Sequence, residues 1–112
     1  THRLSEYVWE EQNQVSAMLS FGDTADTDLA EAFEIWRIYV APQFQKKGIG
    51  KLLLEFAEKQ AKRQGYKRIV IWAFKDNYRA VSFYQKHGYC IDKEEYLGEP
   101  YLAIGTRLKK EI

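Results

Sequence analysis

The stretch from Phe33 to Phe74 constrains the fold of this chain more than any other. β-Branched and aromatic residues fill positions 33–40 and 68–74, as is typical of strands in a sheet interior. Between these runs, apolar residues recur at the spacing of an amphipathic helix. We therefore predict a β-α-β unit with parallel strands, a right-handed crossover and a helix from Lys46 or Gly48 to Gln64.

The turn before this helix reads Gln45-Lys46-Lys47-Gly48-Ile49-Gly50. A helix start leaves backbone N–H groups without partners and carries roughly +0.5 of an elementary charge. The glycines lack Cβ atoms, so an anion can approach the main chain closely. Lys46, Lys47 and Lys51 add positive charge around the same point. The turn therefore predicts a site for a phosphate-bearing ligand.

The spacing of the turn excludes two common phosphate loops. A P-loop requires a glycine where Gln45 stands and a hydroxyl residue where Leu52 stands. The dinucleotide pattern Gly-x-Gly-x-x-Gly begins at Gly48 but meets Leu53 at its third glycine position. The pattern that remains is Gln/Arg-x-x-Gly-x-Gly/Ala.

The other segments complete a mixed sheet. We expect strands over 4–10 and 15–21 in a hairpin and a loop over 22–28. A second helix should begin at Asp76 or Asn77 and end near His87, followed by a short strand over 89–91, a charged loop or hairpin over 92–100 and a last strand over 101–108. The order β-β-β-α-β-α-β-β predicts one α/β domain, with an α+β mixed sheet, over residues 1–112.

Composition narrows the classes of function. The chain has 17 basic and 16 acidic side chains, a net charge of +1, so it has no broad basic field for nucleic acid. Its one cysteine, Cys90, excludes an internal disulfide framework and a cysteine zinc site. We expect Cys90 to be a small buried hydrophobe. No apolar run approaches the roughly 20 residues of a membrane span, so we expect a cytoplasmic protein without membrane or nucleic-acid partners.

A second motif follows the second predicted parallel strand. The run from Asn77 to Tyr89 fits Asn-x-x-Ala-x-x-x-Tyr-x-x-x-Gly-Phe/Tyr, and its spacing places Asn77 and Tyr84 on one side of a helix. With the turn at 45–50, this motif resembles the GCN5-related N-acetyltransferases (GNAT) in order and spacing. The resemblance covers the chain from about Tyr7 to Leu108. The usual first strand and one or two helices of that family have no counterpart here, so the chain resembles a member that is short at its N-terminus.

The resemblance implies a GNAT-like acyl-coenzyme A N-acyltransferase fold, acetyl-coenzyme A as the donor and no metal. In this family the two parallel strands splay apart and the cofactor enters between them. The cofactor-binding positions that it implies are Ile38, Tyr39, Val40, Gln45, Lys46, Lys47, Gly48, Ile49, Gly50, Lys51 and Asn77. Backbone groups of Ile38 and Val40 would pair with the pantetheine arm, and N–H groups from Lys46 to Lys51 would hold the pyrophosphate.

The implied reaction is direct attack of a neutral amine on the thioester in a ternary complex. Tyr84 would protonate the leaving thiolate, and a backbone N–H near Val40 would stabilise the oxyanion. Glu34 is the best candidate for the base that deprotonates the amine. Some relatives carry a glutamate on the other parallel strand, where Trp72 stands here, so a single dedicated base is not implied. Cys90 is not needed as a nucleophile.

Two interpretations of the acidic residues between Asp23 and Glu34 remain open. They form a solvated loop, or they form a lip that attracts a cationic acceptor such as a polyamine. The expected acceptor is a primary amine of a small molecule or a peptide. The alternative function is a non-catalytic module that binds or senses acyl-coenzyme A. A sheet edge exposed by a missing N-terminal strand should favour self-association into a homodimer.

Overall fold

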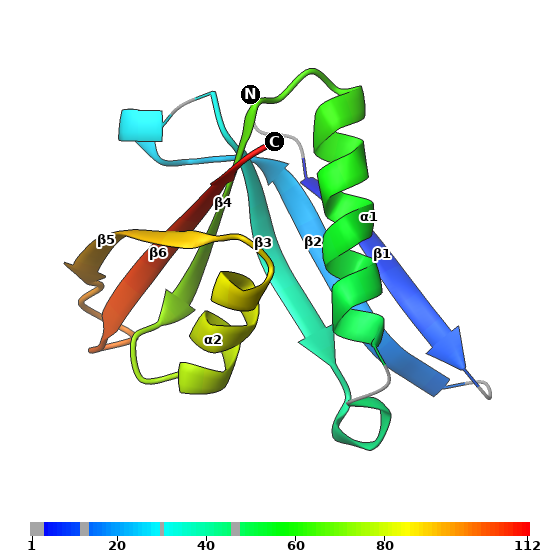
Figure 1. Cartoon of the computed structure of the whole chain (residues 1–112). Coiled ribbons are helices and arrows are strands. Elements are labelled where there is room, and N and C mark those ends of the chain that lie inside the picture. Colours follow the sequence, from blue (N-terminus) through cyan, green and yellow to red (C-terminus); the bar gives the residue numbers. More distant parts are fainter. Residues whose placement is uncertain (1–3, 12–13, 30, 46–47) are drawn as a thin grey trace.

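Figure 1 shows the computed structural model of the chain, which describes residues 4–11, 14–29, 31–45 and 48–112. The strands are β1 Leu4–Glu11, β2 Gln14–Asp23, β3 Phe33–Val40, β4 Arg68–Phe74, β5 Cys90–Tyr96 and β6 Ile104–Glu111. The helices are α1 Ile49–Arg63 and α2 Tyr78–Lys86, and η1 Thr27–Leu29 and η2 Pro42–Phe44 are short 3-10 turns. The predicted order β-β-β-α-β-α-β-β is confirmed, and η1 and η2 are additions to it.

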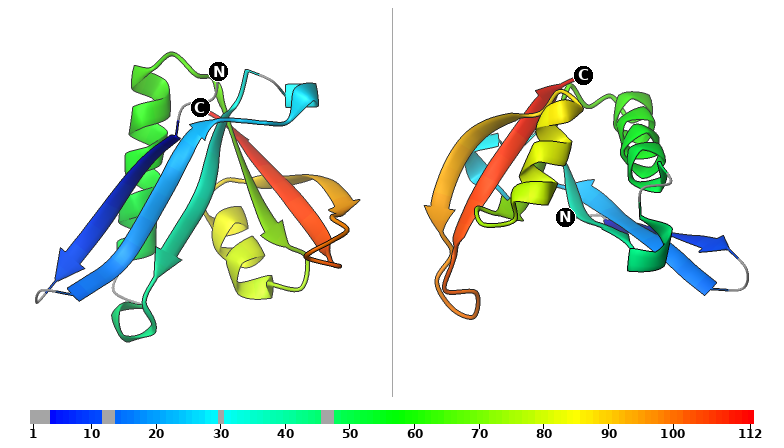
Figure 2. Two further views of the ribbon diagram at one scale, coloured as in Figure 1. Left: turned by 180° about the vertical axis from the view of Figure 1, so that it is seen from behind. Right: turned by 60° about the horizontal axis from the view of Figure 1, so that its bottom comes forward.

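The six strands form one mixed sheet in the order β1-β2-β3-β4-β6-β5. Among the strands of the described residues, only β3 and β4 pair in parallel, and every other neighbouring pair is antiparallel. Both helices cover the same face of the sheet: they stand in front of the strands in Figure 1 and behind them in the left view of Figure 2. The molecule is therefore a two-layer sandwich of helices on a sheet.

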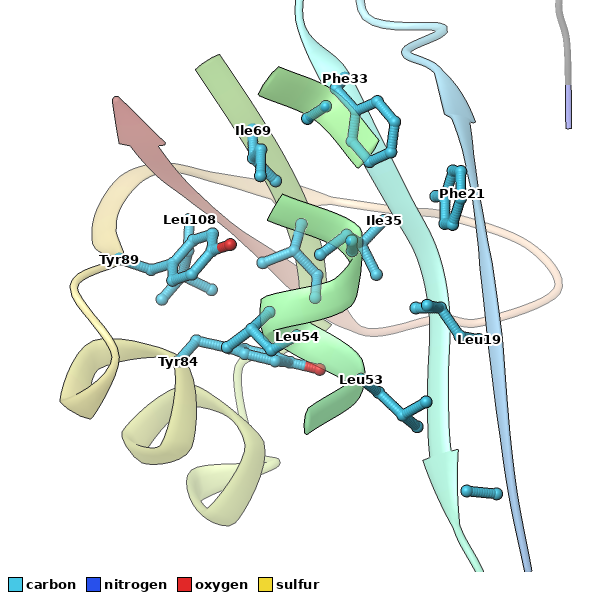
Figure 3. Packing of buried hydrophobic residues seen from close by; sticks show 14 of the residues in the cluster. Leu19, Phe21, Phe33, Ile35, Leu53, Leu54, Ile69, Tyr84, Tyr89 and Leu108 are labelled. Atoms are coloured by element: carbon cyan, nitrogen blue, oxygen red, sulfur yellow. The ribbon is translucent and has the colours of Figure 1, made fainter. Parts of the chain in front are cut away.

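The core lies between α1 and the strands beneath it. The buried residues of α1 lie on one apolar face of the helix and are Ile49, Leu53, Leu54, Ala57 and Ala61. Phe21 and Phe33 contribute neighbouring rings from β2 and β3, with centroids 4.9 Å apart. Figure 3 shows Tyr84 and Tyr89 joining this cluster from α2 and the residues after it. Neither helix in the described part of the chain is long and apolar enough to cross a membrane.

The parallel pairing of β3 and β4 is short. It joins Phe33–Ile35 to Ile69–Ile71 and ends there. Farther along, the two strands diverge, as Figure 1 shows at their arrowheads. Here β3 stays paired with β2 as far as Val40, while β4 stays paired with β6 as far as Phe74. The sheet therefore opens in its middle, between two halves that are each held together on their outer sides.

An irregularity in β3 changes which side chains face the helices. The register with β2 shifts between Ser20 and Phe21, which are partners of Arg37 and Ile35, so Trp36 is an extra residue. Such a bulge reverses the alternation of side chains along a strand. Ile38 and Val40 consequently pack against the same core as Phe33 and Ile35. Regular alternation along β3 would place Ile38 on the face of Glu34, and the bulge moves it to the opposite face.

The C-terminal hairpin also differs from the prediction. Of the expected charged loop or hairpin over 92–100, the structure has the hairpin: β5 continues beyond the predicted strand over 89–91 to Tyr96 and pairs with β6 as far as Ile104. The last strand starts and ends about three residues later than expected, at Ile104–Glu111. The expectation that Cys90 is buried was wrong, since it is exposed at the start of the edge strand β5.

Candidate functional site

A cleft of about 600 Å³ lies where β3 and β4 part. It is lined by Ala25, Asp26, Glu34, Ile35, Trp36, Arg37, Ile38, Ile71, Trp72, Ala73, Phe74, Asn77, Ala80, Tyr84, Glu95, Leu97, Tyr101 and Gly105. Ile35, Ile71 and Tyr84 belong to the core on the helix side. Glu34 and Trp72 alternate with those core positions along their strands, so they come from the opposite face. The cleft thus takes side chains from both faces of the sheet.

Two predicted site residues of α2 meet in this cleft. Asn77 is the N-cap of α2, and its side-chain oxygen accepts a hydrogen bond from the Ala80 N–H over 3.2 Å. Tyr84 lies near the other end of the helix and is 6% exposed. Figure 3 shows its ring extending from α2 toward α1, with the hydroxyl at the far end. Burial raises the pKa of the Tyr84 hydroxyl to about 12, so this group stays protonated at neutral pH.

Glu34 is a buried carboxyl at the opposite wall of the cleft, with 5% of its surface exposed. Its Oε1 accepts a hydrogen bond from the Thr24 hydroxyl over 2.6 Å. Burial raises the pKa of Glu34 above the ordinary value of 4.5, and the nearby Asp26 adds to the rise. The hydrogen bonds from Thr24 and from the Ala25 backbone, together with the charge of Arg107, oppose it. A carboxyl in this environment is suited to exchange protons.

The acidic segment that contains Glu34 is largely paired within the fold. Asp26 and Asp28 both accept hydrogen bonds from Arg107 of β6, whose side chain is 3% exposed. Asp23 accepts a hydrogen bond from the Tyr66 hydroxyl. Asp26 and Glu34 line the cleft, whereas Asp23 and Asp28 do not belong to its lining. The segment is therefore neither a simple solvated loop nor a continuous acidic lip.

The phosphate turn lies at the end of α1 that follows η2. Gly48 is the N-cap of α1 with φ of 78°, a left-handed conformation that favours glycine. A Cβ placed there would meet no atom within 4 Å, so the space beside Gly48 is open. The first turn of α1 contains no acidic residue, and no side chain caps it. These features suit an anion at the helix start.

The expected reason for glycine at position 50 was close approach of an anion to the main chain, but the structure shows a packing reason. A Cβ at Gly50 would lie 3.3 Å from the ring of Phe83 in α2. The residue therefore lets α2 pack against the first turn of α1, and its side faces protein rather than an open space. Only its backbone N–H is then available to a ligand.

The remaining predicted positions lie along β3 and the turn. Gln45 donates a side-chain hydrogen bond to the Val40 carbonyl over 3.0 Å, so it ties the turn to the end of β3. Ile38 lines the cleft, Tyr39 is 48% exposed and Ile49 is buried in the core. Lys51 is exposed in the first turn of α1. Lys46 and Lys47 lie outside the described residues.

The sequence patterns did not predict a role near Glu34 for three polar residues: Thr24, Asp26 as an individual residue, and Arg107. Arg107 is separated from Asp26 by 81 positions, and no local pattern connects them. The available signal was that Arg107 is the one charged residue of the predicted strand over 101–108. A charged residue at such a position is nearly always paired.

Comparison with known proteins agrees with this architecture. The sequence model described as Acetyltransferase (GNAT) family matches residues 1–89. A solved GNAT family acetyltransferase from Elizabethkingia anophelis with acetyl-CoA bound is similar over 96% of this chain and 75% of that chain, with a TM-score of 0.78 and 26% identity. The spermidine N(1)-acetyltransferase of Thermoplasma acidophilum is 34% identical over 64 residues, which make up 57% of this chain and 40% of that protein.

A second curated relative is the peptidyl-lysine N-acetyltransferase YiaC of Escherichia coli, which is 26% identical over 85 residues, or 76% of this chain and 49% of that protein. The chain spans less than half of the length of each of these two curated relatives. The family match itself covers most of the chain and includes the turn at 45–50, the cleft strands and α2. The chain therefore belongs to the acetyltransferase (GNAT) family.

Proposed function

We propose that this chain binds acetyl-coenzyme A and transfers its acetyl group to a primary amine, as one acetyltransferase domain over residues 1–112. The observation that carries the proposal is the cleft between β3 and β4. Tyr84 lines it from the helix side and Glu34 from the opposite side, and the open start of α1 follows the end of β3. This arrangement offers one entrance for the donor and another for the acceptor.

The residues on the helix side fit the donor in three places. The N–H groups of the first turn of α1, beside Gly48, would hold the pyrophosphate, with Lys51 nearby. We assign Lys46 and Lys47 to the same anion site. The edge of β3 from Ile38 to Val40 has no strand beside it on the cleft side in the described part of the chain. Its backbone groups would pair with the amides of the pantetheine arm, and so would the Asn77 side chain.

The reaction needs two proton transfers, one to the leaving sulfur and one from the acceptor amine. When bound, acetyl-coenzyme A supplies the acetyl group. Its coenzyme A thiol, the leaving group, has a pKa near that of cysteine, about 8.5. Tyr84 would donate to the leaving sulfur, because its hydroxyl keeps its proton at neutral pH. Glu34 would take a proton from the acceptor's ammonium group, directly or through water, so that the neutral amine attacks the thioester. A backbone N–H near Val40 would donate to the acetyl oxygen.

The lining on the other side favours a cationic acceptor. It includes the carboxylates of Asp26, Glu34 and Glu95 against a single arginine, Arg37. Its aromatic side chains Trp36, Phe74 and Tyr101 are 43%, 43% and 60% exposed, and such rings attract ammonium groups. The name of the Thermoplasma acidophilum relative points to the same class of substrate. We therefore propose a polyamine-like acceptor, with a lysine-containing peptide as the second choice.

Turnover on a panel of amines tests this function. Release of coenzyme A thiol from acetyl-coenzyme A is measured with spermidine, a lysine peptide and an uncharged-chain amine of similar length. We expect release with all three and the highest kcat/KM with spermidine. Tight binding of acetyl-coenzyme A without release on any amine would overturn the enzymatic proposal and favour a binding or sensing module. Preference for the uncharged-chain amine would overturn the acceptor assignment alone.

A further inference from the structure

A chain of hydrogen bonds runs from Arg107 to the carboxyl of Glu34. Arg107 Nη1 donates to Asp26 Oδ2 over 3.1 Å. The backbone N–H of Asp26 donates to Thr24 Oγ1 over 3.1 Å, and the Thr24 hydroxyl donates to Glu34 Oε1 over 2.6 Å. Each link is a direct contact within the described residues. The arginine and the carboxyl are therefore connected although they stand on separate strands.

The sheet places Arg107 and Glu34, the two ends of this series of hydrogen bonds, on one face. Arg107 stands opposite Trp72 in the pairing of β4 with β6, and Glu34 stands opposite Val70 in the pairing of β3 with β4. Val70 and Trp72 are two residues apart on β4, so all four side chains share a face. That face is opposite to the helices, because Leu108, the neighbour of Arg107, belongs to the core under α1. Asp26 and Asp28, from the segment 24–29, contact Trp72 and Arg107 on this face.

The 24–29 segment is held at its base and at its tip. At the base, the Thr24 N–H donates to the Ala32 carbonyl over 3.2 Å. At the tip, Arg107 donates to both oxygens of Asp28 over 2.8 Å each and to Asp26. A planar guanidinium can bind a carboxylate through two parallel hydrogen bonds, which a lysine cannot do. Arg107 is therefore the clamp that fixes the tip of this segment to the sheet.

Arg107 is anchored from behind as well. Its Nε donates to Asp92 of β5 over 2.8 Å, and its guanidinium carbon lies 5.9 Å from the centre of the Trp72 ring. Trp72 in turn donates its ring N–H to Asp26 Oδ2 over 2.9 Å. The guanidinium is thus held by an edge strand, a ring and the 24–29 segment at once. A side chain that is fixed in this way can transmit its own position to the groups it binds.

We propose that Arg107 is a positioning residue for Glu34: it clamps the tip of the 24–29 segment and thereby holds the Thr24 hydroxyl and the Ala25 N–H against the Glu34 carboxyl. The catalytic consequence rests on the proposed function, in which Glu34 is the base. The orientation itself does not, because it is a property of the folded chain. The charged groups that act on Glu34 are Asp26 of the segment and Arg107 itself, and the other charged residues of the cleft lining are Arg37 and Glu95.

The test is Arg107→Lys, with Arg68→Lys as the matched control. Arg68 pairs with Glu111 through an exposed ion pair and does not line the cleft. The pKa of the Glu34 carboxyl is read by carbon-13 NMR titration, and the exchange of the Asp26 amide hydrogen is read on the same samples without substrates. In Arg107→Lys we expect the pKa of Glu34 to rise by roughly half a unit or more and the Asp26 amide to exchange at least about tenfold faster. Arg68→Lys should leave both unchanged.

A folded Arg107→Lys protein with an unchanged Glu34 pKa and unchanged Asp26 exchange would overturn the proposal. If that variant does not fold, Thr24→Val breaks the chain one link closer to Glu34. It must also raise the pKa of Glu34 for the proposal to stand.

Kinetics separates this inference from the proposed function. With an active protein, Arg107→Lys should move the acidic limb of the kcat profile to higher pH by the same amount, with the KM for acetyl-coenzyme A unchanged. A shifted Glu34 pKa with an unmoved kcat profile would support the positioning role and count against Glu34 as the base.

Discussion

Ile35 and Ile71 form the last registered pair between the parallel strands β3 and β4, and both line the cleft that opens beyond them. The bulge at Trp36 comes directly after this pair. It increases the local twist of β3 and carries the strand away from β4. A one-residue irregularity therefore accounts for both the opening of the sheet and the return of Ile38 and Val40 to the core face.

Replacing Tyr84 with Phe should slow acetyl transfer without weakening donor binding. The substitution removes the hydroxyl and keeps the ring in the core. We expect kcat to fall by about 10²-fold, the usual contribution of a proton-donating group. The Kd for acetyl-coenzyme A should stay within about twofold, since the proposed donor contacts do not involve the Tyr84 hydroxyl. Steady-state kinetics and calorimetry measure the two quantities.

The matched control is Tyr89→Phe. Tyr89 is also buried, and its hydroxyl donates to Glu58 over 2.9 Å, away from the cleft lining. This variant should lose about 1 kcal/mol of stability with one hydrogen bond and keep its kcat. An equal loss of kcat in both variants would show that the effect of Tyr84 is structural.

Glu34→Gln should remove the acidic limb of the pH–rate profile. A base must be deprotonated to act, and burial raises the pKa of Glu34 above 4.5. The kcat of the natural protein should therefore fall as pH drops through a value above 4.5. In Glu34→Gln we expect kcat at pH 7 to fall by roughly 10²-fold and this limb to disappear. The control is Glu31→Gln, at an exposed glutamate of the same acidic segment, which should keep both the kcat at pH 7 and the acidic limb. If the acidic limb persists in Glu34→Gln, the base is another group.

Two substitutions at Asn77 separate its cap from its proposed contact with the donor. Asn77→Ala removes the oxygen that accepts from the Ala80 N–H and should lower the free energy of unfolding by about 1 kcal/mol. Asn77→Ser supplies another capping oxygen and should restore most of this stability. Both variants lack the amide and should bind acetyl-coenzyme A more weakly. Denaturant unfolding measures the stability and calorimetry measures the affinity for acetyl-coenzyme A. Unchanged affinity in Asn77→Ser would show that Asn77 acts only as a helix cap.

Gly48→Asp should reduce donor affinity through its charge. The site has open space for a side chain and a φ of 78°, which Asn and Asp tolerate better than most residues. Gly48→Asn introduces the same strain without charge and is the control. We expect the Asp variant to bind acetyl-coenzyme A at least about tenfold more weakly than the Asn variant, because only about 1.4 kcal/mol of repulsion is needed. If calorimetry gives equal affinities for acetyl-coenzyme A in the Asp and Asn variants, the pyrophosphate does not bind at this turn.

Most of the elements could be predicted from the sequence because they depend on local periodicity and local chemistry. The strand Phe33–Val40 and the strand Arg68–Phe74 have their predicted bounds, and α1 begins one residue after Gly48, the later of its two predicted starts, and ends one residue before Gln64. Asn77 caps α2 as one of the two expected residues. Asn77 and Tyr84 reach one cleft because their separation is nearly two helical turns.

The rest of the site depends on contacts between residues that are distant in the sequence. Alternation along β3 could not predict the bulge, since the bulge exists only relative to β2. The reason for glycine at position 50 is the ring of Phe83, which arrives with α2. The exposure of Cys90 follows from the position of β5 at the sheet edge.

The sequence by itself therefore determined the family pattern, the glycine at the start of α1 and the two motif residues of α2, because backbone periodicity and helix ends are properties of short segments. Only the tertiary structure decided the environment of Glu34. Its burial, the Thr24 hydroxyl and the clamp by Arg107 come from three separate segments. Burial and charge set the protonation of a carboxyl, and both exist only once the sheet has assembled.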